Sequence, residues 1–262
     1  AGFVEWLPAP VDQSLKALTA AVLTEWVNLE AARGLKASTL GKQLVMLRSF
    51  LQFCHRSGRT GQDFSGVVPH AAAWRLSSIP DPVPAGTIEA LFGTLDLRSA
   101  KGMRDRAILL IGFAGGLRRS EIVSLDHGKD DTPDSGGWVE IAEGGVLLTL
   151  RGKTGWREVE IARGSSDQTC PVHALTQWLH YARIDFGPIF VATSRNGLKA
   201  TSERLSDKHV ARLIKSCARE AGLRPDLPEA ERVRLFSGHS LRAGLASSAE
   251  VDERYVQKQL GH

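Results

Sequence analysis

The chain has 262 residues, of which 42% are hydrophobic and 24% charged, and it carries a net charge of +4 with a pI of about 9.1. This composition is ordinary for a soluble globular protein, and the length allows two domains. No stretch approaches a membrane span and the N-terminus shows no signal peptide, so we expect no membrane partner. Three distant cysteines without a CxxC pair argue against a disulfide framework and a zinc site, and predict a reducing, cytoplasmic location.

Lysine and arginine are concentrated in three stretches. Residues 33–59 hold six of them and no acid, residues 98–119 hold six against one acid, and residues 195–224 hold eight against three. Clustered cations suit a polyanion such as nucleic acid. Solvated helix faces are the alternative for any one cluster, because Lys and Arg are mostly exposed. Three clusters together favour nucleic acid.

The N-terminal part is predicted to be helical. Apolar residues recur at spacings of three and four over 12–32, and again on a second helix that runs to about His55 and ends at Gly58. The stripe on this second helix consists of Leu40, Leu44, Leu47 and Leu51. Three prolines in SSIPDPVP, residues 77–84, predict a linker over 79–84 between a first domain, 1–78, and a second, 85–262.

The second domain is predicted to hold helices around one small sheet. The β-rich runs WVEIA, VLLTL and REVEI are separated by turn residues, which is typical of a small antiparallel sheet. Helices are expected over 85–95, 102–114, 118–125, 171–185, 206–221, 240–249 and 252–260. The predicted fold class is therefore α+β and mostly helical, with a small all-α domain first.

The stretch GGLRRSEIVSL, residues 115–125, can hold a phosphate. Its glycine pair lets the backbone turn sharply, which places Arg118 at the start of a helix beside free N–H groups. A guanidinium in that place is suited to clamp a phosphate. Glu121, three residues on, shares the helix face and can hold the guanidinium in position. An ordinary exposed ion pair is the alternative.

Lys153, in LLTLRGKTGWREVEI, falls in the turn of the predicted hairpin, from which it can reach a neighbouring cleft. A solvated turn lysine is the commoner explanation of such a residue when it stands alone. The letters GKT do not indicate a P-loop, because that motif needs glycine where Leu147 stands and a helix after it.

The C-terminal stretch GHSLR places His239 and Arg242 three residues apart, so on a helix they face the same way. Arginine can grip two phosphate oxygens, and histidine can move a proton near neutral pH. His262 follows in LGH. His239 and His262 lack a third ligand at useful spacing, so we expect no metal there.

The order GLRRSEI, RGKTG on a hairpin, GHSLRAG and LGH resembles the tyrosine recombinase family, the phage-integrase-like enzymes, over residues 85–262. MLRSFLQFCHRSG, residues 46–58, also resembles the core-binding domain that precedes the catalytic domain in this family. The resemblance implies an enzyme that cuts and rejoins double-stranded DNA through a 3′-phosphotyrosyl intermediate, without metal or other cofactor. It also implies a tetramer assembled on paired DNA sites.

The resemblance implies a role for each residue of the motifs. Arg118 and Arg242 would hold the scissile phosphate, and Lys153 would protonate the leaving 5′-oxygen. His239 would assist proton transfer, His262 would contact the phosphate, and Glu121 would support Arg118. Further DNA contacts are expected from basic residues of both domains: Lys36, Lys42, Arg48, Arg56, Arg119, Lys208 and Arg212.

In this family the nucleophilic tyrosine lies shortly after the last histidine, but the chain holds only Tyr181 and Tyr255. Tyr181 is distant from the motifs, and Tyr255 is expected on the packing face of its helix. We therefore expect this chain to bind DNA without cleaving it, as a recombinase lacking its C-terminal helix.

Two other functions are alternatives to this one. A non-catalytic DNA-binding regulator or accessory protein derived from a recombinase would keep the phosphate pocket and lack the nucleophile. A metal-dependent nuclease would need carboxylates clustered with histidine, but the candidate acids lie in one loop without such partners. These acids are Asp126, Asp130, Asp131 and Asp134.

Overall fold

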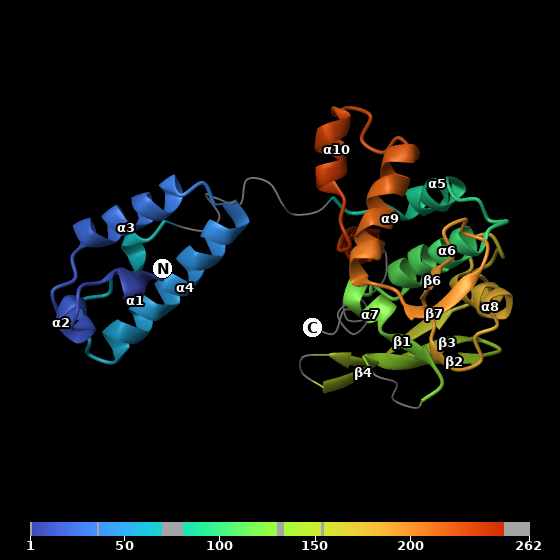
Figure 1. Cartoon of the computed structure of the whole chain (residues 1–262), viewed down its shortest axis with the longest axis horizontal. Coiled ribbons are helices and arrows are strands. Elements are labelled where there is room, and N and C mark those ends of the chain that lie inside the picture. Colours follow the sequence, from blue (N-terminus) through green and yellow to red (C-terminus); the bar gives the residue numbers. More distant parts are fainter. Residues whose placement is uncertain (1, 36, 70–80, 130–133, 153–154, 249–262) are drawn as a thin grey trace. The chain divides into compact units, whose positions relative to one another are not determined.

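A computed structural model describes residues 2–35, 37–69, 81–129, 134–152 and 155–248 of the chain. The chain divides into two compact units, Ala1–Ser78 and Ile79–His262 (Figure 1). Each unit is built around its own hydrophobic cluster, and the two clusters share no residue.

The first unit consists of helices. They are α1 (Phe3–Trp6), α2 (Val11–Lys16), α3 (Ala20–Ala32), α4 (Ala37–Arg56) and a 3-10 turn at Ser65–Val67. The predicted leucine stripe of α4 is confirmed, because all four of its leucines are buried. The prediction of one helix over 12–32 is wrong. The chain breaks at Thr19, whose side chain accepts a hydrogen bond from the Val22 N–H at 3.4 Å and so starts α3 afresh.

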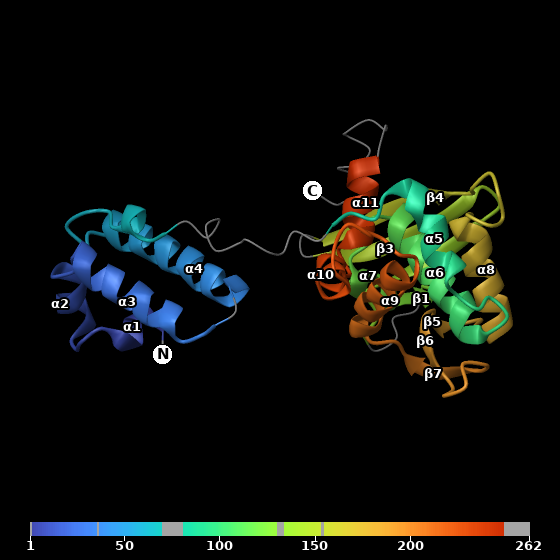
Figure 2. The same cartoon turned by 90° about the horizontal axis from the view of Figure 1, so that it is seen from above.

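The second unit contains helices and strands (Figures 1 and 2). Its helices are α5 (Ile88–Gly93) after a 3-10 turn at Ala85–Thr87, α6 (Ala100–Ala114), α7 (Arg119–Val123), α8 (Pro171–Ala182), α9 (Asp207–Glu220), α10 (Glu229–Leu235) and α11 (Ser240–Ser248). Its strands are β1 (Leu125–His127), β2 (Gly137–Ala142), β3 (Gly145–Gly152), β4 (Gly155–Ala162), β5 (Gly187–Pro188), β6 (Val191–Thr193) and β7 (Ala200–Arg204). The mostly helical α+β prediction is confirmed. The expected helix over 252–260 lies outside the described residues.

The sheet has the strand order β4-β3-β2-β1-β5. The predicted antiparallel set is present as β2, β3 and β4, with β3 and β4 paired from Gly145 opposite Ala162 to Gly152 opposite Gly155. Two additional strands extend it, because β1 lies parallel to β2 and β5 lies antiparallel to β1. Strands β6 and β7 form a separate antiparallel pair. These additional strands have two to five residues each, too short for a clear alternating pattern.

Helix α6 runs through the core of the second unit and positions the candidate site. Residues 107–111 are all buried, and α8, α9 and α11 pack against this helix. Gly112 allows α7 and α11 to come close, since a Cβ added there would lie 2.8 Å from Ile122 and 2.9 Å from Leu241. The C-terminal end of α6 therefore brings together the GGLRRSEI and GHSLR motifs.

Candidate functional site

The turn after α6 places Arg118. The helix ends at Ala114, and Gly116 adopts the left-handed conformation with φ of +56°. Leu117 is fully buried, and its N–H donates to the Gly112 carbonyl at 3.0 Å. Arg118 then stands at the N-cap of α7, so the expected position of this arginine at a helix start is confirmed.

Glu121 holds Arg118 through both its backbone and its side chain. The Arg118 N–H donates to Glu121 Oε2 at 2.7 Å, and Arg118 Nη1 donates to Oε1 at 2.7 Å. The Arg118 side chain is 43% exposed, whereas that of Glu121 is 9% exposed. The pair is therefore not the freely solvated ion pair of the alternative explanation, because its carboxylate is buried.

A second arginine, missed by the sequence analysis, contacts the same carboxylate. Arg157 on β4 donates from Nη2 to Glu121 Oε2 at 3.0 Å, and its side chain is 15% exposed. A signal was present in the hairpin sequence. Arg157 shares the parity of the buried residues Val159 and Ile161, so it is an arginine on the inward face of a strand.

Arg242 joins this group from α11. Its Nη1 donates to the Gly116 carbonyl at 2.8 Å, which ties α11 to the turn that carries Arg118. Burial lowers the pKa of Arg242 to about 10, and the neighbouring positive charges of Arg118 and Arg157 act in the same direction against Glu121. Arg242 is still a cation at neutral pH, in a region of concentrated positive charge.

The pKa of Glu121 lies below its ordinary value. Burial alone would raise this pKa, but the hydrogen bonds from Arg118 and the charge of Arg157 outweigh the burial. The carboxylate is therefore ionised at neutral pH. One buried anion shared by Arg118 and Arg157, with Arg242 close by, leaves a site with excess positive charge suited to a phosphate.

Of the remaining predicted site residues, the structure describes His239. His239 is exposed and stands just before α11, and its carbonyl accepts the Ala243 N–H at 2.9 Å. It thus lies at the start of the helix that carries Arg242, three residues away in sequence. Lys153 and His262 lie outside the described residues, although the two strands that flank Lys153 are paired.

The residues expected to contact DNA differ in their surroundings. Lys42, Arg56, Lys208 and Arg212 are exposed. Arg48 is half-buried and donates from Nε to the Ser65 carbonyl at 3.1 Å, so part of its guanidinium serves the fold. Arg119 forms an ion pair with Asp207 at 3.0 Å, and Lys36 lies outside the described residues.

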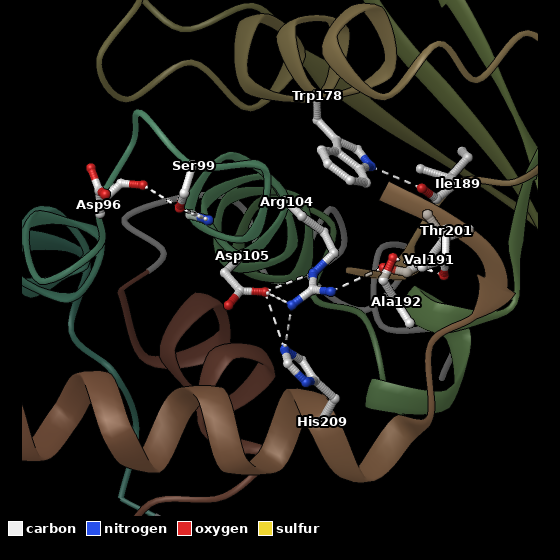
Figure 3. Close-up of polar contacts among 11 residues, drawn as sticks. Asp96, Ser99, Arg104, Asp105, Trp178, Ile189, Val191, Ala192, Thr201 and His209 are labelled. Atoms are coloured by element: carbon white, nitrogen blue, oxygen red, sulfur yellow. Dashed lines mark hydrogen bonds and ion pairs between the residues drawn. The ribbon is translucent and has the colours of Figure 1, made fainter. Parts of the chain in front are cut away.

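Two arginines of the second basic stretch are interior residues and do not add to a basic surface. Arg104 is 2% exposed and contacts Asp105, His209 and the Val191 carbonyl, which joins α6, α9 and β6 (Figure 3). Arg106 is 6% exposed and donates to two backbone carbonyls, those of residues 167 and 168. Counting charges along the sequence therefore overstated the basic surface of residues 98–119.

The acids considered for a nuclease do not form a metal site in the described residues. Asp126 is fully buried in β1 and pairs with Arg204 at 2.6 Å, while Asp134 is exposed. Asp130 and Asp131 lie outside the described residues. Among the described residues, no three of His, Cys, Asp and Glu are grouped to hold a metal ion.

All three cysteines are buried free thiols. Within the described ranges, no helix combines the length and the hydrophobicity that a membrane span requires.

The chain is similar to known recombinases in sequence. The family model described as the phage integrase family matches residues 84–262. An integrase/recombinase xerD homolog of Selenomonas ruminantium is 33% identical over 259 residues, which cover 92% of this chain and 69% of that protein. Tyrosine recombinase XerC of Chlamydia caviae is 27% identical, over 86% of this chain and 64% of that protein. Parts of these relatives thus have no counterpart in the 262 residues.

Solved structures show the same fold. A XerH site-specific recombinase in a pre-cleavage complex with its difH substrate matches with a TM-score of 0.59 at 17% identity, over 95% of this chain and 65% of that one. A lambda integrase dimer bound to a COC′ core site matches with a TM-score of 0.58 at 16% identity, over 95% and 77% of the two chains.

Proposed function

The chain belongs to the phage integrase family, and from that premise we propose that it is the DNA-binding and phosphate-activating part of a site-specific recombinase. The reaction is cleavage and rejoining of double-stranded DNA through a 3′-phosphotyrosyl intermediate. The observation that carries this proposal is the meeting of Arg118 and Arg242 at the Gly116 turn, around the ionised Glu121.

In the proposed mechanism Arg118 and Arg242 bind the non-bridging oxygens of the scissile phosphate. Phosphoryl transfer depends mainly on positioning and on stabilisation of the charge that spreads over these oxygens in the transition state. Lys153 protonates the leaving 5′-oxygen, His239 assists proton transfer and His262 contacts the phosphate. Glu121 supports Arg118.

The partner is duplex DNA, and the full recombinase acts as a tetramer on paired sites. The exposed cations Lys42 and Arg56 in the first unit and Lys208 and Arg212 in the second bind backbone phosphates, which fixes position more than sequence. Buried free cysteines fit the reducing environment of the cytoplasm, where we place the protein.

The test of DNA binding is a fluorescence anisotropy titration of a labelled duplex over a series of KCl concentrations. We expect the logarithm of the association constant to fall linearly and steeply with the logarithm of salt concentration, because bound cations release counterions from DNA. Binding that is absent, or that is indifferent to salt, would contradict a phosphate-binding surface.

We expect residues 1–262 to bind DNA without cutting it. The Tyr181 hydroxyl donates to the Leu198 carbonyl at 3.1 Å. The other tyrosine of the sequence, Tyr255, lies outside the described residues. The measurement is a denaturing gel of nicked duplexes incubated with the chain and with the polypeptide encoded by any longer reading frame. An adduct formed by residues 1–262 alone would overturn this expectation. A stop codon directly after His262 would favour the non-catalytic regulator.

A further inference from the structure

The Glu121 carboxylate is shared by two elements that are distant in sequence. Its Oε1 accepts from Arg118 Nη1 at 2.7 Å. Its Oε2 accepts from the Arg118 backbone N–H at 2.7 Å and from Arg157 Nη2 at 3.0 Å. The contact with Arg157 joins β4 to the first turn of α7.

The two arginines differ in their access to a ligand. The Arg118 side chain is 43% exposed, whereas that of Arg157 is 15% exposed and that of Glu121 is 9% exposed. A phosphate arriving from solvent can therefore reach Arg118 directly, with Glu121 and Arg157 lying behind it. This order separates a phosphate ligand from the groups that support it.

The Glu121 carboxylate and a DNA phosphate compete for the Arg118 guanidinium. A buried carboxylate that lacks a second cation holds its single arginine partner tightly, because an unpaired buried charge is costly. A phosphate must then compete with Glu121 for the same guanidinium. A second arginine on Oε2 satisfies much of the carboxylate's need for a positive partner, and it restores the positive charge that Glu121 removes from the site.

We propose that Arg157 is a positioning residue of the phosphate site, which keeps Arg118 available to DNA by holding the Glu121 carboxylate from behind. The inference rests on the proposed function, because it assumes that Arg118 binds a DNA phosphate. Arg157 itself does not touch the DNA. It acts through Glu121, and the consequence of losing it depends on whether Glu121 carries a charge.

The experiment is a mutant cycle read by duplex binding and by its salt dependence. The variants are R157M, E121Q, R118M, the double variants R157M/E121Q and R118M/R157M, and the control R151M, which removes an exposed cation from the same hairpin. We expect R157M to weaken binding about tenfold, the effect of losing one charge-assisted contact. Its salt slope should fall by about one, like that of R118M, because Arg118 is captured by Glu121.

Two results separate positioning from a merely structural role. R157M/E121Q should recover both the affinity and the slope, because a neutral Glu121 replacement no longer competes for Arg118. R118M/R157M should bind no more weakly than R118M. The proposal would be overturned if R157M/E121Q bound duplex as weakly as R157M does. It would also be overturned if the losses of affinity in R118M and R157M added up in R118M/R157M. Should R157M fail to fold by circular dichroism, R157Q and R157K complete the same cycle, with binding retained better by the charged R157K.

The cycle also distinguishes failure of this inference from failure of the proposed function. A wild-type chain that does not bind duplex, or an R118M variant with the wild-type slope, contradicts phosphate binding by Arg118 itself. If R118M reduces the salt slope of duplex binding while R157M behaves like R151M, only the role of Arg157 is rejected. The proposed function is then retained.

Discussion

Glu121 is the residue at which the charges of the candidate site meet. Its burial opposes ionisation, yet donors from Arg118 and Arg157 keep it an anion at neutral pH. The contact with Arg118 could be predicted from sequence, because residues three apart meet on one helix turn. The contact with Arg157 spans 36 residues, and the contact between Arg104 and His209 spans 105. Long-range contacts of this kind depend on tertiary packing, which no local pattern encodes.

Glu121 should make stability depend on pH. Because its pKa is lowered in the folded state, its contribution is complete above the unfolded carboxyl pKa of about 4.3 and is lost as the pH falls through the folded value. We expect E121Q to be less stable than wild type at neutral pH, with the difference shrinking in acid. Urea unfolding from pH 7 to pH 3 measures this. A stability difference between E121Q and wild type that is constant over that pH range would contradict the assigned ionisation. The control is E158Q, which changes an exposed residue on β4.

Among the elements, strong apolar periodicity predicted the long helices. It did not reveal where local capping starts a helix, nor where the short strands lie. The leucine stripe of α4 was visible because four leucines repeat on one face. The break before α3 depends on one hydrogen bond to Thr19, which a periodic pattern does not reveal. Strand β1 has three residues and gains its place in the sheet from its parallel pairing with β2.

The register of β2 against β3 requires glycine at position 137. Gly137 has φ of +144°, and an added Cβ would lie 1.9 Å from the Thr149 carbonyl oxygen. We expect G137A to lower the free energy of unfolding by about 2–5 kcal/mol, through backbone strain and overpacking. Gly144 offers a matched control, since a Cβ there meets nothing within 4 Å. Chemical denaturation of both variants decides the matter. Equal stabilities would show that the sheet accommodates the change.

At the scale of the whole molecule, the described residues form two cores that share no side chain. A unit with its own core can unfold as its own cooperative step. The linker prolines predicted two parts from sequence. The long-range contacts that bring α11 to the end of α6, and so create the site, could not be foreseen from the separate motifs.

Calorimetry should therefore resolve two transitions that respond to different mutations. Leu44 and Leu109 are fully buried, one in each core. Each change to alanine is expected to cost about 2–5 kcal/mol in the unit that contains it. L44A should lower the temperature of one transition and L109A that of the other. A single transition that both variants shift equally would show that the units unfold together.

In the proposed function, Arg118 and Arg242 together bind a DNA phosphate. The most direct measurement is the salt slope of duplex binding for the double variant R118M/R242M, compared with R98M/R195M, which removes two exposed arginines outside the site. The predicted result is a slope smaller by about two in the site variant and near the wild-type value in the control. Identical slopes in a folded R118M/R242M protein and the wild type would contradict phosphate binding by these two arginines.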